Sequence, residues 1–257
     1  MSRALAVLLA LMSSAALMSA SAWATPIAVR YPESITHAFL TLRGPNGDVL
    51  AHGELVQAPV EGQRVESRLV FRFKDGSLWD DKVIYTQQKV FRVMSYHHVE
   101  RGPSFPEAID ASFDRDTGRY RAKVDDKTDE GTIDLPEDLH NGLTLVLLKN
   151  LPRGAVGTGH MLVFTPKPYM LDTDLRAEGE DKFLLGDLAR TATRYLVKLE
   201  LKGVTGVVAS LIGKDPPDQR YWISTGPAPG FVKLEGALFP KGPRWRIEFA
   251  PPRWPER

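Results

Sequence analysis

Residues 65–74 read VESRLVFRFK, and apolar and charged side chains alternate along this stretch. Successive side chains of a β-strand point to opposite faces, so such a stretch forms a strand with one apolar and one charged face. The apolar face consists of Val65, Leu69, Phe71 and Phe73. The same alternation returns in residues 194–201, RYLVKLEL, and in residues 244–249, RWRIEF. Strands of this kind are typical of antiparallel sheets.

Turn-forming residues separate the predicted strands at short intervals. Glycine, asparagine and aspartate cluster at residues 44–48, 74–77, 114–118 and 126–131, and these residue types suit tight reversals. Successive hairpins follow, because the intervals leave no room for crossover helices. We predict thirteen strands, at residues 35–43, 48–57, 63–74, 77–87, 89–100, 108–114, 119–124, 160–165, 168–178, 191–202, 219–225, 230–236 and 244–250.

One helix is predicted, at residues 136–149. Pro136 suits a first helical turn, and Glu137 and Asp138 beside it match the positive end of the helix dipole. Apolar residues then recur at helical spacing until Pro152 ends the run, and these are Leu139, Leu143, Val146 and Leu147. Residues 204–211 carry a weaker helical prediction, for which a strand or a turn is an equal alternative.

These patterns predict a mainly β protein. We expect a large curved antiparallel sheet or an unclosed β-barrel, with one helix at about 136–149 covering a face of the sheet. The glycine-rich residues 153–159 form too short a stretch for a domain linker, so residues 25–257 are predicted to be a single domain. Residues 250–255, APPRWP, are predicted to form an extended tail because proline disrupts regular structure.

The first 24 residues have the three parts of a secretory signal peptide. Arg3 supplies the positive charge, residues 4–18 form the apolar stretch, and Ala22-Trp23-Ala24 is the small-residue end. Cleavage after Ala24 would release a mature chain into the periplasm or the medium. The alternative is an uncleaved anchor, but serine and alanine dilute the apolar run below the roughly 20 residues of a spanning helix. We therefore expect a mature protein that does not span a membrane.

Charge and cysteine content exclude several classes of protein. The chain holds 33 Lys and Arg residues against 32 Asp and Glu, and removal of residues 1–24 takes away only Arg3, leaving 32 of each. This balance argues against nucleic-acid binding and against strong attraction to anionic lipid surfaces. The absence of cysteine excludes disulfides, thiolate metal sites and a lipoprotein anchor.

Few polar residues are candidates for chemistry, and these are Asp80, Gln87, Arg92, His97 and His98. His97 and His98 are adjacent, so in a strand they point to opposite faces and cannot bind one metal ion together. The same holds for the carboxylates of Asp80 and Asp81. His98 and Glu100 share a face, but a zinc site needs a third ligand from elsewhere. We predict no catalytic residue, no cofactor and no metal site.

Several short segments along most of the mature chain carry a resemblance. They are FKDGSL at 73–78, QQKVFR at 87–92, HHV at 97–99, GPSFP at 102–106, ID at 109–110, DLPEDLHNGL at 134–143, LIGK at 211–214 and PPD at 216–218. Together they resemble a family of uncharacterised exported bacterial proteins. This family resemblance identifies kinship and attaches no chemistry to the motifs.

A more distant resemblance is one of pattern. A long meander, a covering helix in mid-chain and returning strands with Tyr221-Trp222-Ile223-Ser224 resemble an unclosed β-barrel. The DUF3108 family shares that barrel with periplasmic lipoprotein carriers and their receptors. The resemblance implies a curved sheet and a helical lid around an apolar cavity for acyl chains, and it transfers no ligand-binding residue.

Three functional hypotheses from different classes remain open. The favoured one is a periplasmic binding module that holds an apolar or amphipathic, lipid-like molecule between sheet and helix. Its predicted contacts are Leu69, Phe71 and Phe73 of the sheet and Leu139, Leu143 and Leu147 of the helix. The second is a scaffold that binds envelope proteins through sheet edges, without a small ligand. The third is a hydrolase or metal-dependent enzyme around His97 and His98, which requires the five polar candidates to converge in one cleft.

Overall fold

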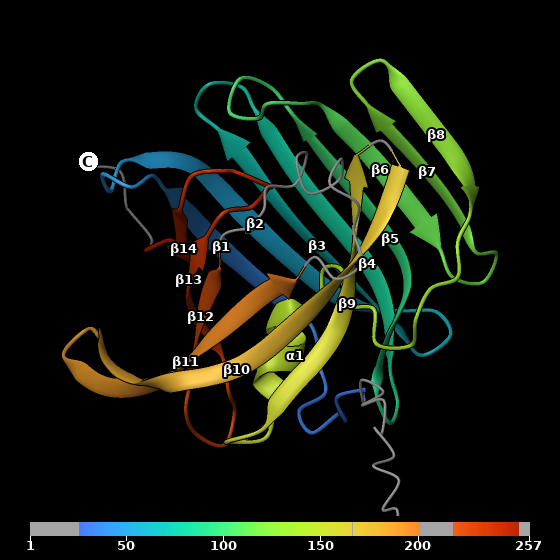
Figure 1. Ribbon diagram of the computed structural model, residues 1–257. Helices are drawn as coiled ribbons and strands as arrows, with labels where there is room; N and C mark the ends of the chain where they lie inside the picture. The colour runs from blue at the N-terminus through green and yellow to red at the C-terminus, as the bar shows by residue number, and fades with distance from the viewer. Residues whose placement is uncertain (1–25, 166, 201–217, 252–257) are drawn as a thin grey trace, which may run out of the picture.

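The computed structural model describes residues 26–165, 167–200 and 218–251. In this part of the chain fourteen strands form one antiparallel sheet, and a single helix accompanies it (Figure 1). The strands are β1 (Thr36–Arg43), β2 (Val49–Val60), β3 (Arg64–Phe73), β4 (Leu78–Gln87), β5 (Phe91–Arg101), β6 (Ile109–Asp114), β7 (Arg119–Val124), β8 (Lys127–Thr132), β9 (Val156–Thr165), β10 (Lys167–Leu185), β11 (Leu188–Glu200), β12 (Gln219–Ser224), β13 (Phe231–Gly236) and β14 (Trp245–Phe249). The helix is α1 (Thr144–Asn150). The mainly β fold is confirmed.

The sheet consists of two antiparallel meanders, β1–β8 and β9–β14, which join where β1 pairs with β14, and it does not close into a complete barrel. Its strand order is β8-β7-β6-β5-β4-β3-β2-β1-β14-β13-β12-β11-β10-β9, so the first and last strands of the chain pair in its middle. The order leaves β8 and β9 as the two edges. Strong curvature nevertheless brings β7 and β9 close together, with Cα atoms within 8 Å. The predicted unclosed, curved antiparallel sheet is therefore confirmed.

One strand was not predicted. Residues 126–131 were expected to be a turn, but the turn consists of Asp125 and Asp126, and Val124 already pairs with Lys127. Asp125 has a φ of 50°, a left-handed conformation that aspartate tolerates in turns. β8 escapes the prediction because its sequence, KTDEGT, has no apolar face. Such a polar strand suits a sheet edge, where charged side chains discourage pairing with other chains.

The helix is shorter than predicted. Residues 136–149 were expected to be helical, but α1 begins at Thr144. Before it, Gly142 has a φ of +72°, which no helix accommodates, and the His140 backbone N–H donates to the His160 carbonyl of β9. Backbone pairing with β9 therefore replaces the first helical turns. The predicted apolar stripe is nevertheless inside, because Leu139, Leu143, Val146 and Leu147 are all buried.

The core fills the space inside the curve of the sheet, where Figure 1 places α1. On β3 the alternation of the sequence is kept: Phe71 is completely buried, whereas Arg68 on the opposite face pairs with Asp80 in solvent. Aromatic side chains pack against one another in one part of this core. Phe73 and Trp245 have centroids 5.4 Å apart, and Phe105 packs edge-on against Phe73 and Phe239. Apolar side chains from early and late strands are buried together in this core, and their burial stabilises the single sheet.

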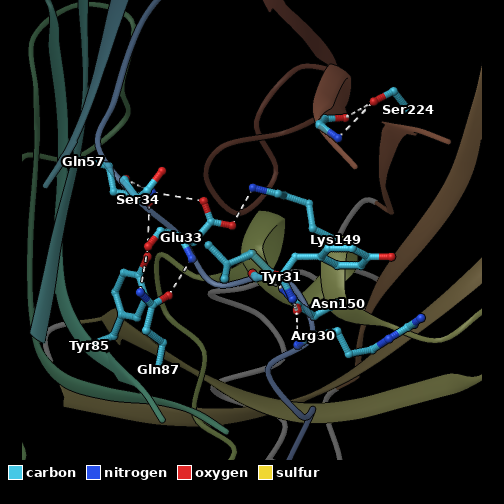
Figure 2. Close-up of polar contacts among 12 residues, drawn as sticks. Arg30, Tyr31, Glu33, Ser34, Gln57, Tyr85, Gln87, Lys149, Asn150 and Ser224 are labelled. Atoms are coloured by element: carbon cyan, nitrogen blue, oxygen red, sulfur yellow. Dashed lines mark hydrogen bonds and ion pairs between the residues drawn. The ribbon is translucent and has the colours of Figure 1, made fainter. Parts of the chain in front are cut away.

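A segment before β1 ties the chain to the end of α1. In this strap, residues 27–34, the backbone N–H groups of Arg30 and Tyr31 both donate to Asn150 Oδ1 at 2.7 Å (Figure 2). The Glu33 side chain forms an ion pair with Lys149. The Glu33 backbone N–H donates to the Gln87 side-chain oxygen, and the Gln87 side-chain amide donates to the Glu33 carbonyl. The C-terminal end of α1 is thus fixed by backbone N–H groups and the Glu33 side chain of the strap, and Gln87 of β4 holds the strap in place.

Three sequence predictions lie outside the described residues. They are the signal peptide at 1–24, the weaker helix at 204–211 and all but the first two residues of the tail at 250–255. In the part of the chain that the structure covers, no helix has both the length and the apolar character needed to cross a bilayer.

Candidate functional site

Strands β3 to β6 place the polar candidates on both faces of the sheet. On the outer face, Asp80 accepts two hydrogen bonds from the guanidinium of Arg68, and these lower the pKa of Asp80. His97 is also on the outer face, with Nε2 at 2.9 Å from Oδ1 of Asp110. His98 points inward, so the predicted opposite orientation of the two histidines is confirmed. The outer pairs are exposed ion pairs of modest energy.

The other two polar candidates lie elsewhere. Gln87, at the end of β4, holds the backbone of Glu33 in the strap (Figure 2). Arg92, near the start of β5, pairs with Glu137 at 2.6 Å, in the segment that leads to α1. The five residues therefore occupy separate environments and do not converge in one cleft. The geometry gives no support to an enzyme built around all five.

Inside the sheet, three titratable side chains form a cluster that we call the ion trio: Asp81, His98 and Glu100. His98 Nδ1 lies 3.4 Å from Asp81 Oδ1, and His98 Nε2 lies 3.6 Å from Glu100 Oε2. All three are buried or nearly so, with side chains 3–14% exposed. Burial opposes the charged imidazolium, but the two nearby carboxylates outweigh it and raise the pKa of His98 to about 9. Two carboxyl groups thus face one imidazole in the trio.

Aromatic residues surround the ion trio. The His98 ring stacks on Tyr96 with centroids 6.3 Å apart and meets Trp79 edge-on at 5.5 Å. The Tyr96 hydroxyl interacts with Asp81 and Asn141, and burial raises its pKa well above the usual value. The indole Nε1 of Trp79 is buried and donates to no side chain or backbone group among the described residues. An unpaired buried donor is costly, so this corner of the interior suits a polar atom from outside the chain.

The trio continues an inward-facing row across four strands. Cross-strand pairing sets Leu55 of β2 opposite Leu69 of β3, Leu69 opposite Asp81 of β4, and Asp81 opposite His98 of β5. We call these four residues the interior row. Leu55 and Leu69 are only partly buried, in contrast to the packed core beside them. The interior row therefore changes from apolar to ionic within four neighbouring strands.

A second buried histidine belongs to α1 and its leading segment. His140 Nε2 lies 2.7 Å from the Thr173 hydroxyl of β10, and Nδ1 lies 3.2 Å from the Thr144 hydroxyl. Burial lowers the pKa of His140 to about 4. Next to it, the Asn141 amide exchanges two 2.8 Å hydrogen bonds with the backbone of Leu162 in β9. We call these residues with α1 the plug, because they fill the concave side of the sheet.

Most of the predicted apolar contact residues belong to the packed core. Their exposed fractions are 0% for Phe71, 7% for Phe73, 1% for Leu139, 1% for Leu143 and 7% for Leu147. The sixth, Leu69, keeps accessible surface next to Asp81. A role of these side chains in ligand binding stays a prediction, and Leu69 is the one whose position leaves room for a contact.

Two open hollows lie on the surface. One, of about 820 Å³, crosses β4 to β8 and is lined by Lys82, His97, Arg121 and Glu130 among others. The other, of about 660 Å³, is lined by Trp222, by arginines and glutamates of β10 to β13, and by Arg244 just before β14. Both are bordered by ladders of opposite charges, as solvated sheet faces are. Within residues 26–251 as described, no three histidine or carboxylate side chains are arranged to hold a metal ion.

Sequence reasoning missed Asp81 as a member of the ion trio and Tyr96 as an aromatic neighbour of the trio. Asp81 was paired with Asp80 as a neighbour and not with His98, its partner across the strands. Alternation along β4 and β5 was the signal for the inward face. The register between the two strands, which decides the partner, carries no signal of its own in the sequence.

The chain was compared with protein-family models, with curated proteins and with solved structures, and none of the three comparisons gives a match. The resemblances of the sequence motifs and of the strand pattern therefore stay predictions.

Proposed function

We propose that this protein is a periplasmic binding module for an amphipathic molecule. The ligand's apolar part would lie along Leu55 and Leu69, and its polar end would meet the ion trio. The observation that carries the proposal is the interior row, which changes from leucine to aspartate and histidine on the concave face of the sheet. An apolar surface with a few convergent polar groups, one of them with a strongly shifted pKa, is the usual character of a small-molecule site.

The charge of the trio specifies the polar end of the ligand. Two carboxylates and one imidazolium leave one negative charge in excess at a site with little water. A positively charged group is the complement of such a site, and a carboxylate of the ligand would be repelled. We therefore propose a ligand with a cationic or amine-bearing end and an alkyl or aromatic body.

The tight packing of the plug argues against a mechanism in which α1 opens as a lid over the ligand. Leu139 and Leu143 are 1% exposed, and the His140 and Asn141 side chains are hydrogen-bonded to β10 and β9. A segment fixed in this way supports the floor of a site. The proposed ligand accordingly lies beside the plug, against β2 to β5, and not underneath α1.

Displacement of a fluorescent naphthylamine probe tests the proposal. We expect dodecylamine to displace the probe at concentrations about tenfold or more below those of dodecanoate, because one charge interaction of about 1.4 kcal/mol separates the two. Asp81→Asn should abolish this preference, and Leu69→Ser should weaken both ligands. Asp80→Asn is the matched control, since the same chemical change falls on the outer face. Absence of saturable binding, or equal binding by the Asp81 and Asp80 variants, would reject the site.

A further inference from the structure

The hairpin of β10 and β11 extends beyond the rest of the sheet. β9 pairs with β10 only as far as Arg176, and β12 pairs with β11 only from Ala192. From Lys182 opposite Thr191 to Leu185 opposite Leu188, the two strands therefore have no third strand beside them among the described residues. Figure 1 shows this end of the hairpin projecting from the body of the molecule. We call residues 182–191 the finger.

The tip of the finger is apolar on both of its faces. Leu184, Leu185 and Leu188 are 71%, 66% and 56% exposed. Neighbouring residues of a strand point to opposite sides, so Leu184 lies on one face and Leu185, with its cross-strand partner Leu188, on the other. A flat protein surface would cover one face of such a ribbon and leave the other in water. A medium that surrounds the tip covers both.

The base of the finger is held firmly to the sheet. Asp181 accepts hydrogen bonds of 2.7 Å from both the Trp222 indole and the Arg194 guanidinium. Arg194 and Arg220 also pair with Glu178, and the Thr225 backbone N–H donates to the Thr191 carbonyl. The leucines are thus presented by an anchored ribbon. Four residue pairs at about 3.4 Å per residue give a reach of roughly 14 Å, less than half of the ~30 Å apolar core of a bilayer.

Two basic residues flank the leucines of the tip. Lys182 and Arg190 are exposed, two residues from Leu184 and Leu188 respectively, and neither has an ion pair with an acidic residue of the described chain. Asp187, in the two-residue turn with Gly186, is the single acid within residues 182–191, so the finger has a net charge of +1 although the predicted mature chain is neutral. Basic side chains at this position match anionic lipid headgroups, at about 1 kcal/mol for each residue near the surface.

We propose that the finger inserts its leucines into the surface of a membrane with anionic lipids, to the depth of the headgroups and the first carbons. Lys182 and Arg190 then lie among the phosphates. Asp187 sits at the leading end, where its carboxylate is costly to bury, and this residue limits the insertion to the interface. The proposal goes beyond ligand binding, because it concerns a surface that the interior row does not touch.

Flotation with vesicles tests this surface, using the chain from Thr25 onward. One set of vesicles contains phosphatidylethanolamine and phosphatidylglycerol, and the other contains phosphatidylcholine alone. Replacement of Leu184, Leu185 and Leu188 by serine should lower binding to the anionic vesicles about tenfold or more. Lys182→Gln and Arg190→Gln should each lower it by about fivefold, an effect that added salt removes. Asp187→Asn should strengthen it.

The control replaces Ile35, Phe39 and Val56 by serine, because these apolar residues are 78%, 58% and 45% exposed in and just before β1 and in β2. This control should bind vesicles within about twofold of the wild type, because its residues lie on a face of the sheet beside the His37–Glu54 pair and do not project from the sheet as the finger does. The urea midpoints of all variants are measured in parallel to establish that each is folded. The proposal is overturned by a wild type that does not float with either vesicle, or by serine variants of the tip and of the control that bind alike. Loss of a dimer in the tip variant without vesicle binding would also overturn it, and would assign the finger to a protein contact.

Discussion

The interior of this protein holds two buried histidines with opposite protonation behaviour. Burial disfavours the charged imidazole at both positions. In the plug, the ring nitrogens of His140 meet the hydroxyls of Thr144 and Thr173, and burial lowers its pKa to about 4. In the ion trio, His98 meets Asp81 and Glu100, and its pKa rises to about 9. Depth in the core therefore does not decide the charge of a histidine, whereas the partners supplied by the neighbouring strands do.

The two regions also differ in how completely their polar groups are paired. His140 and Asn141 have hydrogen-bond partners for their ring and amide atoms, and the leucines around them are packed. Near His98, the Trp79 indole N–H, His98 Nδ1 and Asp81 Oδ1 have no hydrogen-bond partner in the described chain. A satisfied network stabilises the fold. An unsatisfied one lowers stability and is the kind of place where a ligand gains affinity.

Truncation in the plug should have the largest effect. Leu143→Ala is expected to lower the free energy of unfolding by about 2–5 kcal/mol, through lost burial and the cavity left behind. Leu69→Ala, in the interior row, should cost less than about 2 kcal/mol because part of that side chain already faces solvent. Urea unfolding of both variants measures the difference. Equal losses would mean that the interior row is packed as tightly as the plug.

The trio should make stability fall at alkaline pH. The pKa of His98 is raised from 6.5 to about 9, so its contribution is complete below pH 6.5 and is lost as pH rises through 9. A pKa raised from 6.5 to about 9 corresponds to roughly 3 kcal/mol of stability. Urea midpoints of the wild type and of His98→Gln between pH 6 and pH 10 check it. A parallel pH dependence of the two proteins would contradict the charged trio.

The plug should respond at the acid side. The pKa of His140 is lowered from 6.5 to about 4, so its contribution is complete above pH 6.5 and is lost as pH falls through 4, again by roughly 3 kcal/mol at full protonation. Carboxylates titrate in the same range, and the His140→Gln difference isolates the histidine. Imidazole NMR signals provide a direct measurement. A His140 signal that titrates near pH 6.5 would show that the plug admits water.

Substitutions of outer-face residues on β4 and β5 should have the smallest effects on stability. Asp80→Asn removes an ion pair whose arginine is half exposed, and it should cost at most about 1 kcal/mol. His97→Gln, adjacent to His98 on the chain, should change stability by less than about 0.5 kcal/mol. Neither should alter the alkaline pH dependence of unfolding. Were Asp80→Asn to shift the pKa of His98 as much as Asp81→Asn does, the separation of the two faces would be wrong.

The alternation of side chains made much of this architecture predictable. Residues 65–74 determine a strand with a charged outer face, and β3 has this form. Opposite orientation of His97 and His98 follows from the same rule. The polar β8 was missed because no apolar face marks it. The finger was missed because leucines on both faces of a ribbon break the alternation that a half-buried strand requires.

The pairing that creates the ion trio could not be predicted. From the turn, Gln87 pairs with Phe91 and Tyr85 with Val93, but Ile84 pairs with Ser95, so Met94 is an extra residue in β5. Without this bulge Asp81 would stand opposite His97 instead of His98. One inserted residue exchanges which side chains meet across the strands. The local sequence of Val93-Met94-Ser95 does not identify such a bulge.

The pairing of β1 with β14 has a consequence for how the chain folds. Leu40 stands opposite Phe249, which is a separation of 249 − 40 = 209 residues along the chain. The middle of the sheet can therefore form only after synthesis of the last strand, and contacts of such long range make folding slow, on the order of milliseconds to seconds or longer. A chain that stops before β14 leaves β1 and β13 as open edges. Completion of this sheet therefore depends on residues 245–249, which are synthesised after every other described strand.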